Sequence, residues 1–577
     1  MLPGSLGTQR LPRLVRIERA LEMMLGGQPI TAEAALAEGL IDAIETGDPS
    51  TLGAAYARQL LAQGSGPRPT RERSIVSASV APDFFADALV DVQRKRGPYP
   101  APQAIVRALQ AAVAGDFDAG AALEAKLFDE CRLSPVSRAM RHTFFAERAA
   151  GKIPGLVRAQ QQRRIAKVGV IGAGTMGGGI AMNFANAGIA TVIVESESAT
   201  LERGLATVRR NYAQSAAKGK LTLEGVEQRM ALLTGSLDMN DLADYDLVIE
   251  AVYENMEIKQ QVLSKLGGIC KAGAILATNT STLDVKLIAQ ASGRPQSVVG
   301  MHFFSPANVM RLLEVVRGDQ TSPEVLATVM YVARRIGKTA VVSGVCYGFI
   351  GNRMAESYMR ENEFLLIEGA TPAQIDAAIE DPARVGLAMG PCRMLDMAGI
   401  DVGAKTLIEL RKIGGVPPDP SYRAVAMRLF EQGRLGQKTG SGYYRYDGRT
   451  PLAEPDTALV CKALAAEYGV AQREHVAPQE IVERLLYPMI NEAARILEEG
   501  VAFRPGDIDI VWTAGYGFPD HRGGPLFMAD EIGLATIVER LNHYARVRSN
   551  TFGYWTPCKL LTDLAASGQR ISDWRPH

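Results

Sequence analysis

A glycine-rich turn between an apolar strand and a helix is the feature that most restricts what this chain can fold into. In residues 164–196 the apolar run KVGVI leads into GAGTMG, a helix, and a second apolar run that ends in an acidic residue. Gly172 permits the tight turn, Gly174 lets the backbone approach a pyrophosphate, and Gly177 lets the helix pack closely on the strand. The start of the helix, with Thr175 and Met176, would face the phosphates. The pattern predicts a βαβ unit that binds a dinucleotide.

The acidic residue at the end of the second strand indicates which dinucleotide this is. Glu195 lies 23 residues beyond Gly172, where a carboxylate can accept hydrogen bonds from both ribose hydroxyls. It would repel a 2′-phosphate, and the next arginine is Arg203. The glycine motif by itself is shared by FAD proteins, and such turns also occur for purely structural reasons. With Glu195 in place, we expect NAD rather than NADP.

Charge and cysteine usage exclude several classes of function. The 63 basic and 63 acidic residues cancel, so no net field draws the chain to nucleic acid or to anionic lipid. The six cysteines form no CxxC pair and no cluster with histidine at zinc spacing, so we expect neither a disulfide scaffold nor a metal site. The uncharged stretch 168–194 is rich in glycine and changes its period midway, which is typical of strand–helix–strand rather than of a membrane span.

Short apolar strands alternate with helices around the glycine motif. Strands are expected at 165–171, 190–194, 245–250, 274–278 and 297–301. This alternation predicts an α/β Rossmann-type domain. Before it, residues 80–93 and 101–150 read as helices, and after about residue 344 the chain is almost entirely helical.

The helical part after residue 344 contains an internal repeat. Three pairs recur in the same order: Glu368-Gly369 as Glu499-Gly500, Ile375-Asp376 as Ile508-Asp509, and Gly390-Pro391 as Gly524-Pro525. The offset drifts slightly, as a duplication with small insertions would produce. Chance similarity between amphipathic helices is the alternative, but it does not explain why turn, proline and Gly-Pro positions all recur in order. We therefore predict two repeated all-α domains.

A histidine and a glutamate suggest a catalytic pair. His302 directly follows a predicted strand, where open α/β folds gather their active sites. Glu314 lies twelve residues further on, in the apolar stretch LLEVV, where a buried carboxylate needs a partner. Orienting the imidazole of His302 would supply that partner and make the ring a better base. Taken alone, the spacing leaves two alternatives open, an ordinary core or surface histidine and a pair between Glu314 and Arg311.

Five separated motifs together resemble one family. GAGTMG, EAVYENMEIK, NTSTL, HFFSPANVM with LLEVV, and GFIGNR occur in this order. Over roughly residues 165–450 the chain thereby resembles the (3S)-3-hydroxyacyl-CoA dehydrogenases of fatty-acid β-oxidation. One departure is Cys346-Tyr347 before GF, where single-activity members more often have proline.

The resemblance implies roles for the residues within these motifs. His302 would be the general base that takes the 3-hydroxyl proton while hydride leaves C3 for the nicotinamide, and Glu314 would orient and polarise it. Ser281 and Asn352 would hydrogen-bond the substrate oxygens or the histidine. The positions that match the surroundings of the cofactor are Glu250, Glu254, Lys259 and Asn279. The implied substrate is an acyl-CoA, with NAD as the cofactor and no metal.

Two further features resemble the multifunctional branch of this family. The repeated helical domain could bury within one chain the face through which single-activity members dimerise, so a monomer is plausible. LPGSLGTQRLPRLV and MMLGGQPITAEAALAEGLIDAI resemble the later half of a crotonase (enoyl-CoA hydratase/isomerase) domain. No residue here matches that family's oxyanion-hole glycine or catalytic glutamates, so we expect hydratase activity to be absent. We also expect the first 60 residues to be poorly stabilised.

These observations predict an order of segments: a partial crotonase-like α/β segment (1–63), a helical linker (64–160), the NAD-binding Rossmann domain (161–343), the helical dehydrogenase domain (344–450) and its second copy (451–577). Three alternatives stand beside this reading: a full hydratase–dehydrogenase whose N-terminus is missing here, a non-catalytic NAD-binding protein, and the α-subunit of a complex with a thiolase. The first residues lack the apolar core of a signal peptide, and the C-terminal RPH is not an SKL-type signal. We therefore expect a cytoplasmic location, or a peroxisomal one only in a eukaryote.

Overall fold

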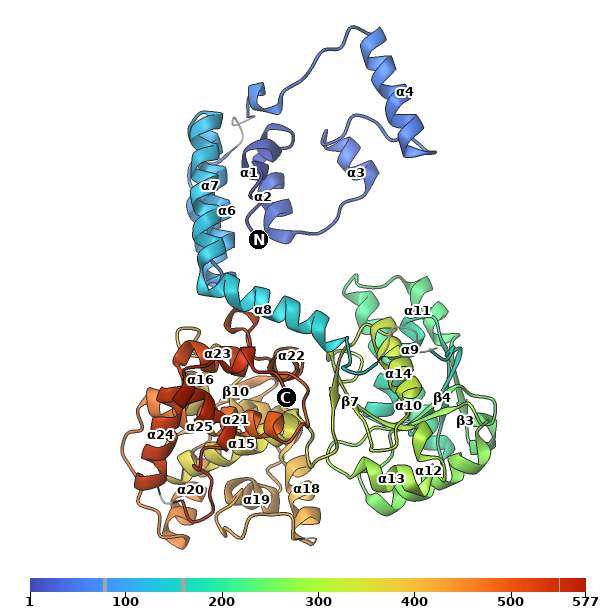
Figure 1. Cartoon of the computed structure of the whole chain (residues 1–577), viewed down its shortest axis with the longest axis vertical. Coiled ribbons are helices and arrows are strands. Elements are labelled where there is room, and N and C mark those ends of the chain that lie inside the picture. Colours follow the sequence, from blue (N-terminus) through green and yellow to red (C-terminus); the bar gives the residue numbers. More distant parts are fainter. Residues whose placement is uncertain (76–79, 157–161, 413, 549, 577) are drawn as a thin grey trace. The chain divides into compact units, whose positions relative to one another are not determined.

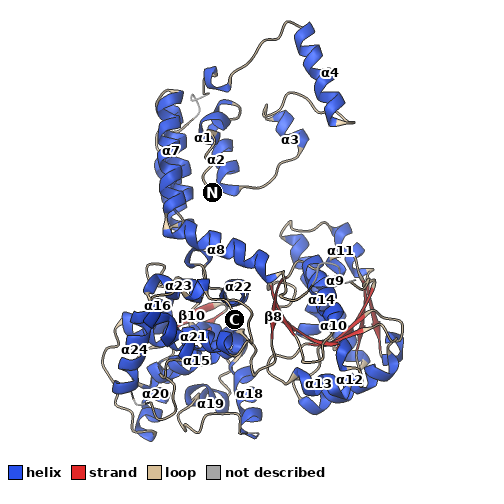
Figure 2. Cartoon of the chain, viewed as in Figure 1, coloured by secondary structure: helices blue, strands red, loops and turns tan. Residues whose placement is uncertain are grey.

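The structure is a computed structural model that describes residues 1–75, 80–156, 162–412, 414–548 and 550–576. Over this part the chain divides into two units, Met1–Arg141 and His142–His577 (Figure 1). The first unit is helical, whereas the second combines a sheet with a large helical part, as the colouring of Figure 2 shows. Within the described residues no helix is both long and apolar enough to cross a membrane.

The first unit has its core where α1 and α2 pack on α6, with Leu2 and Leu21 buried there. Its α-helices are α1 (Gly7–Arg10), α2 (Ile17–Gly26), α3 (Ala32–Ala37), α4 (Pro49–Ala62), α5 (Phe84–Arg96), α6 (Pro100–Ala114) and α7 (Phe117–Leu133), and α8 (Pro135–Ala150) continues into the second unit. The buried carboxylate of Glu124 on α7 accepts hydrogen bonds from the backbone N–H groups of Leu6 (2.7 Å) and Thr8 (3.0 Å). These contacts tie the start of α1 to α7.

The remaining helices of the first unit are packed less well. α4 buries none of its residues, and α3 buries only Ala35. The weak packing expected for the first 60 residues is thus found in α3 and α4 but not in α1 and α2. No strand occurs among the described residues of this unit, so the α/β character expected for residues 1–63 is not found there.

The second unit contains an eight-stranded sheet in the order β3-β2-β1-β4-β5-β6-β7-β8. The strands are β1 (Lys167–Ile171), β2 (Ala190–Val194), β3 (Leu233–Ser236), β4 (Leu247–Glu250), β5 (Ile275–Thr278), β6 (Val298–Phe303), β7 (Leu312–Val316) and β8 (Thr339–Ser343). Neighbouring strands are parallel except β6 and β7, which are antiparallel. The strand order reverses at β1, so the carboxyl ends of β1 and β4 flank the crevice in which such sheets bind ligands. The predicted Rossmann-type domain is confirmed.

Helices cover both faces of this sheet (Figure 1). One apolar cluster joins the sheet to α9 (Thr175–Asn186), α10 (Ser198–Ala217) and α14 (Pro323–Arg335), and a second joins it to α12 (Met256–Ile269) and α13 (Val285–Ala291). A further helix, α11 (Leu223–Met230), packs on α9 and α10. The alternating strands and helices of the sequence therefore form two helical layers around one sheet.

The rest of the second unit is helical except for one short antiparallel pair, β9 (Arg445–Asp447) and β10 (Thr450–Leu452). The first copy of the repeat contains α15 (Gly351–Ile367), α16 (Pro372–Glu380), α17 (Pro391–Ala398), α18 (Ile400–Lys412) and α19 (Ala424–Glu431), and α20 (Pro455–Glu467) follows it. The second copy contains α21 (Pro478–Glu498), α22 (Pro505–Gly515), α23 (Pro525–Ile532), α24 (Leu534–Val547) and α25 (Lys559–Ser567). The helical fold expected after residue 344 is confirmed.

The repeated residues make the same contact in both copies. Asp376 accepts a hydrogen bond from the backbone N–H of Cys392 (2.9 Å), and Asp509 accepts one from that of Leu526 (2.7 Å). Both donors follow the proline of a Gly-Pro pair, at the start of the next helix. The second carboxylate oxygen has a different partner in each copy. That of Asp376 binds the Tyr444 hydroxyl, whereas that of Asp509 binds His142 of α8.

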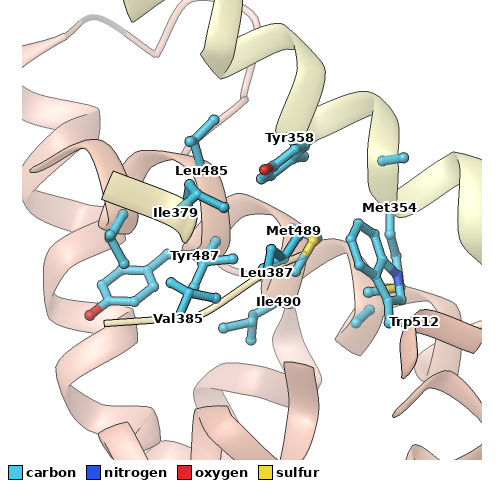
Figure 3. Close-up of a cluster of buried hydrophobic side chains, with 14 of the residues drawn as sticks. Met354, Tyr358, Ile379, Val385, Leu387, Leu485, Tyr487, Met489, Ile490 and Trp512 are labelled. Atoms are coloured by element: carbon cyan, nitrogen blue, oxygen red, sulfur yellow. The ribbon is translucent and has the colours of Figure 1, made fainter. Parts of the chain in front are cut away.

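The two copies share one apolar core. α15 packs along α21, and Figure 3 shows the side chains that meet between the copies. Met354 and Tyr358 of α15 lie in one cluster with Leu485 and Met489 of α21 and with Trp512 of α22. The second copy therefore covers the apolar face of α15.

Candidate active site

The antiparallel pairing of β6 and β7 brings His302 and Glu314 together. The two residues are direct partners in the register, and their side chains therefore point to the same face of the sheet. The His302 Nδ1 atom lies 2.7 Å from Glu314 Oε2, and Glu314 is fully buried. Arg311, the alternative partner, pairs with Glu147 instead.

The other oxygen of Glu314 is held by the turn before α15. Glu314 Oε1 accepts hydrogen bonds from the backbone N–H groups of Ile350 (3.2 Å) and Gly351 (3.0 Å). Gly348 and Phe349 both have positive φ (71° and 51°), which turns the GFIGNR backbone so that these groups face the carboxylate. A carboxylate can only accept, so Nδ1 of His302 carries the hydrogen and Nε2 is left as the basic atom.

Ser281 and Asn352 meet beside this pair. Asn352, in the first turn of α15, directs its Nδ2 to the carbonyl oxygen of Ser281 at 3.4 Å. The Ser281 hydroxyl donates to Glu254 Oε1 (3.1 Å). Both residues are partly exposed, so each has a polar face that a substrate could reach.

The residues expected around the cofactor form a connected network after β4 and β5. Lys259 is fully buried and places its ammonium 3.0 Å from both oxygens of Glu250 and 3.4 Å from Glu254 Oε2. Thr278 donates to Glu250, and Thr280 donates to Glu254. Asn279 accepts a hydrogen bond from the backbone N–H of Phe303 (2.9 Å), directly after His302. The network thus connects the edge of the sheet where the cofactor is expected with β6, the strand that carries His302.

The two glutamates of this network titrate differently. Burial raises the pKa of Glu250, and the nearby Lys259 ammonium and the Thr278 hydroxyl offset this only in part. Burial also tends to raise the pKa of Glu254, but the Lys259 ammonium and the hydrogen bonds from Thr280 and Ser281 prevail, so its pKa lies below the usual value. Glu254 is therefore ionised at neutral pH and holds the Ser281 hydroxyl.

The glycine motif fits a dinucleotide phosphate. A Cβ on Gly172 would lie 2.7 Å from the carbonyl oxygen of Ala251, and one on Gly177 would lie 1.9 Å from that of Gly172, so neither position accepts a side chain. A Cβ on Gly174 would meet no protein atom within 4 Å. The space beside Gly174 is open to a ligand, and among the described residues no side chain caps the start of α9. The first-turn N–H groups, including those of Thr175 and Met176, are available to an anion.

Glu195 lies at the end of β2, beside the glycine motif. Its Oε2 accepts a hydrogen bond from the N–H of Ala173 (2.9 Å), and its Oε1 accepts one from that of Ser196 (2.8 Å). Burial tends to raise the pKa of Glu195, but these hydrogen bonds outweigh it and keep the pKa below its usual value. A negative charge is thus fixed where the adenosine ribose of a dinucleotide would lie.

The structure adds aromatic residues that the sequence did not single out. The ring of Phe304 lies 4.3 Å from that of His302, and Phe349 lies 5.7 Å from it. Tyr516, from the second helical copy, donates to Asn352 Oδ1 (2.7 Å). Phe304 and Phe349 lie within motifs that were recognised, but no motif marks Tyr516, which is 164 residues from its partner.

Comparison with protein families matches most of the second unit. The NAD-binding domain of 3-hydroxyacyl-CoA dehydrogenase matches residues 167–346. The C-terminal domain of 3-hydroxyacyl-CoA dehydrogenase matches residues 348–446 and 481–571, which correspond to the two helical copies.

Curated relatives and solved structures agree. The chain is 39% identical to the peroxisomal bifunctional enzyme of Cavia porcellus, over 100% of this chain and 81% of that protein. It is 34% identical to a glyoxysomal fatty acid β-oxidation multifunctional protein of Brassica napus, over 99% of this chain and 79% of that protein. The structure of 3-hydroxybutyryl-CoA dehydrogenase from Escherichia coli matches with a TM-score of 0.60 and 28% identity, over 70% of this chain and 100% of that chain. The chain therefore belongs to the multifunctional 3-hydroxyacyl-CoA dehydrogenase family and is an NAD-dependent oxidoreductase of fatty-acid β-oxidation.

Proposed function

We propose that the chain oxidises a (3S)-3-hydroxyacyl-CoA to the 3-oxoacyl-CoA with NAD as the hydride acceptor, and that His302 is the general base of this reaction. The observation that carries the proposal is the buried pair of His302 and Glu314, which leaves Nε2 of the imidazole as the free basic atom. This atom takes the proton of the 3-hydroxyl as the C3–H bond breaks. NAD bound at the glycine motif supplies the acceptor for the hydride that leaves C3.

The remaining residues bind and orient. Glu314 fixes the imidazole and stabilises the positive charge that it gains with the proton. Asn352 donates through Nδ2 to the substrate oxygen that becomes the carbonyl, and the Ser281 hydroxyl, whose proton goes to Glu254, accepts a hydrogen bond from the protonated imidazole. Glu195 accepts hydrogen bonds from the ribose hydroxyls of NAD. The edge of the sheet beside the cofactor is kept rigid by the network of Glu250, Glu254, Lys259 and Asn279.

The test follows reduced nicotinamide in purified protein supplied with (3S)-3-hydroxybutyryl-CoA and with a long-chain analogue, using NAD or NADP. We expect NAD to be reduced and His302→Gln to lower kcat by about 10²- to 10⁴-fold, as loss of a general base does. His475→Gln, on an exposed loop, is the matched control and keeps the wild-type rate. Equal activity of wild type and His302→Gln would exclude His302 as the base.

Crotonyl-CoA hydration is measured on the same sample. We expect no hydration above background, in line with the lack of matching hydratase residues in the first unit. The proposal has three further parts. The chain is a monomer, it associates with a thiolase, and it is located in the cytoplasm or in a peroxisome. Sedimentation, co-purification and cell fractionation test them in turn.

A further inference from the structure

The second helical copy extends into the active site through one tyrosine. Tyr516 follows α22, and its hydroxyl donates to Asn352 Oδ1 at 2.7 Å. Its ring is so close to Gly351 that a Cβ there would lie 2.5 Å from it. Gly351 is one of the two residues whose backbone N–H groups hold Glu314. Tyr516 thus contacts the substrate-binding amide and the turn that supports the catalytic pair.

The same ring also touches the aromatic wall of the site. The ring of Tyr516 lies 5.6 Å from that of Phe304, edge to face, and Phe304 in turn packs on His302. On its other side Tyr516 stacks on Trp512 at 4.7 Å. The indole of Trp512 is buried and donates to the sulfur of Met354 on α15. Tyr516 is therefore held rigidly by the core that the two copies share.

Two partners, the Ser281 carbonyl and the Tyr516 hydroxyl, determine which way the amide of Asn352 faces. An amide has one accepting oxygen and one donating nitrogen, and the carbonyl of Ser281 can only accept. Nδ2 must therefore face Ser281, which leaves Oδ1 to accept from Tyr516. Burial raises the pKa of Tyr516 well above its usual value, and the nearby Glu314 raises it further, so the hydroxyl keeps the proton that it donates.

We infer that Tyr516 is a positioning residue for Asn352, and that the second helical copy completes the active site of the first. This inference rests on the proposed function of the site. It gives the duplicated domain a role in catalysis as well as in burying α15. Without the hydroxyl, the amide of Asn352 keeps only its longer contact with the Ser281 carbonyl (3.4 Å), and its donor points less steadily at the substrate oxygen.

The test compares Tyr516→Phe with Tyr544→Phe, a matched change in the same copy. Tyr544 is buried, and its hydroxyl donates to Glu483 away from the site. We expect Tyr516→Phe to lower kcat/KM for (3S)-3-hydroxybutyryl-CoA by about 3- to 10-fold, the effect of one lost hydrogen bond. The KM for NAD stays unchanged because Asn352 lies on the substrate side. Tyr544→Phe keeps both constants.

A double-mutant cycle shows whether the effect passes through Asn352. In the Asn352→Ala background, Tyr516→Phe has nothing left to orient, so we expect no further loss. Effects that multiply, equal losses in Tyr516→Phe and Tyr544→Phe, or an unaltered Tyr516→Phe would each overturn the inference while leaving the proposed function intact. A wild type that reduces no NAD would overturn both. Thermal unfolding of every variant identifies any loss that comes from misfolding.

Discussion

At the residue scale, three hydrogen-bond donors hold the side chain of Glu314. It is fully buried, yet it accepts from His302 and from two backbone N–H groups. A buried acceptor with this many donors cannot be replaced by an amide without conflict, because the amide nitrogen would face a donor. In Glu314→Gln that conflict falls on Nδ1 of His302 or on the turn at Gly351.

We therefore expect Glu314→Gln to lower kcat by about 10²-fold or more, within the range for disabling a general base. Steady-state kinetics with NAD and a short acyl-CoA measures this. Glu147→Gln is the control, since Glu147 pairs with Arg311 at a partly exposed site. A variant that retains the wild-type kcat would show that the carboxylate does not assist His302.

At the same scale, we expect Glu195 to determine the choice between NAD and NADP. Its pKa lies below the usual value, so it is ionised throughout the neutral range. We expect Glu195→Ala to raise the KM for NAD about 10-fold and to narrow the preference for NAD over NADP, because the ribose contacts and the repulsion of the 2′-phosphate are both lost. Kinetics with each cofactor tests this. Glu197→Ala, two residues further on, is the control.

At the scale of elements, the sequence predicted the interior strands better than the edges. The five expected strands all occur, with ends within two residues of those expected, and the apolar stretch LLEVV forms β7. β3 and β8, which lie at the two edges of the sheet, were missed. β3 is only four residues long and contains Gly235, so it carries little apolar signal. β8 is buried because α14 and α22 both pack on it, and a contact with a segment as distant as α22 leaves no local pattern.

The active-site residues also fall into those that the sequence could predict and those that it could not. His302 and Glu314 were predicted because each follows a local pattern, a strand end and a charge within an apolar run. Their contact depends on the register of β6 and β7, which the sequence did not supply. Tyr516 could not be found locally, because its role arises only when the second copy folds against the first.

Burial of the repeated aspartate produces a pH dependence at Asp376. Burial, only partly offset by hydrogen bonds from Cys392 N–H, the Tyr444 hydroxyl and Arg393 N–H, raises the pKa of Asp376 to about 6. Its usual value is 3.8. Between these values the folded chain holds a proton that the unfolded chain has lost. The contribution of Asp376 to stability therefore falls as pH rises through this window.

Asp376→Asn has no such proton. We expect its free energy of unfolding, relative to wild type, to rise by about 3 kcal/mol between about pH 4 and pH 7. Urea unfolding at several pH values measures the difference, and other buried carboxyls cancel because both proteins contain them. Asp447→Asn on the exposed strand β9 is the control. A difference independent of pH would contradict a raised pKa at Asp376.

At the scale of the whole molecule, duplication of the helical domain changes what covers its apolar face. In the second unit α21 covers the apolar face of α15, and Met354, Tyr358 and Trp512 lie in the shared core (Figure 3). Two copies within one chain meet at an effective concentration that no pair of separate chains reaches. The apolar face of α15 is thus buried within one chain. The same packing of the two copies places Tyr516 next to Asn352.

We therefore expect the protein to sediment as a monomer of 62.0 kDa at every concentration tested. A chain cut after Asp447 lacks the second copy, so the face of α15 that α21 buries would be exposed. We expect this truncated chain to dimerise or aggregate. Analytical ultracentrifugation of both chains makes the comparison. A stable dimer of the intact chain would show that a surface other than this shared core joins its copies, and a monomeric, soluble truncated chain would show that α15 does not need its cover.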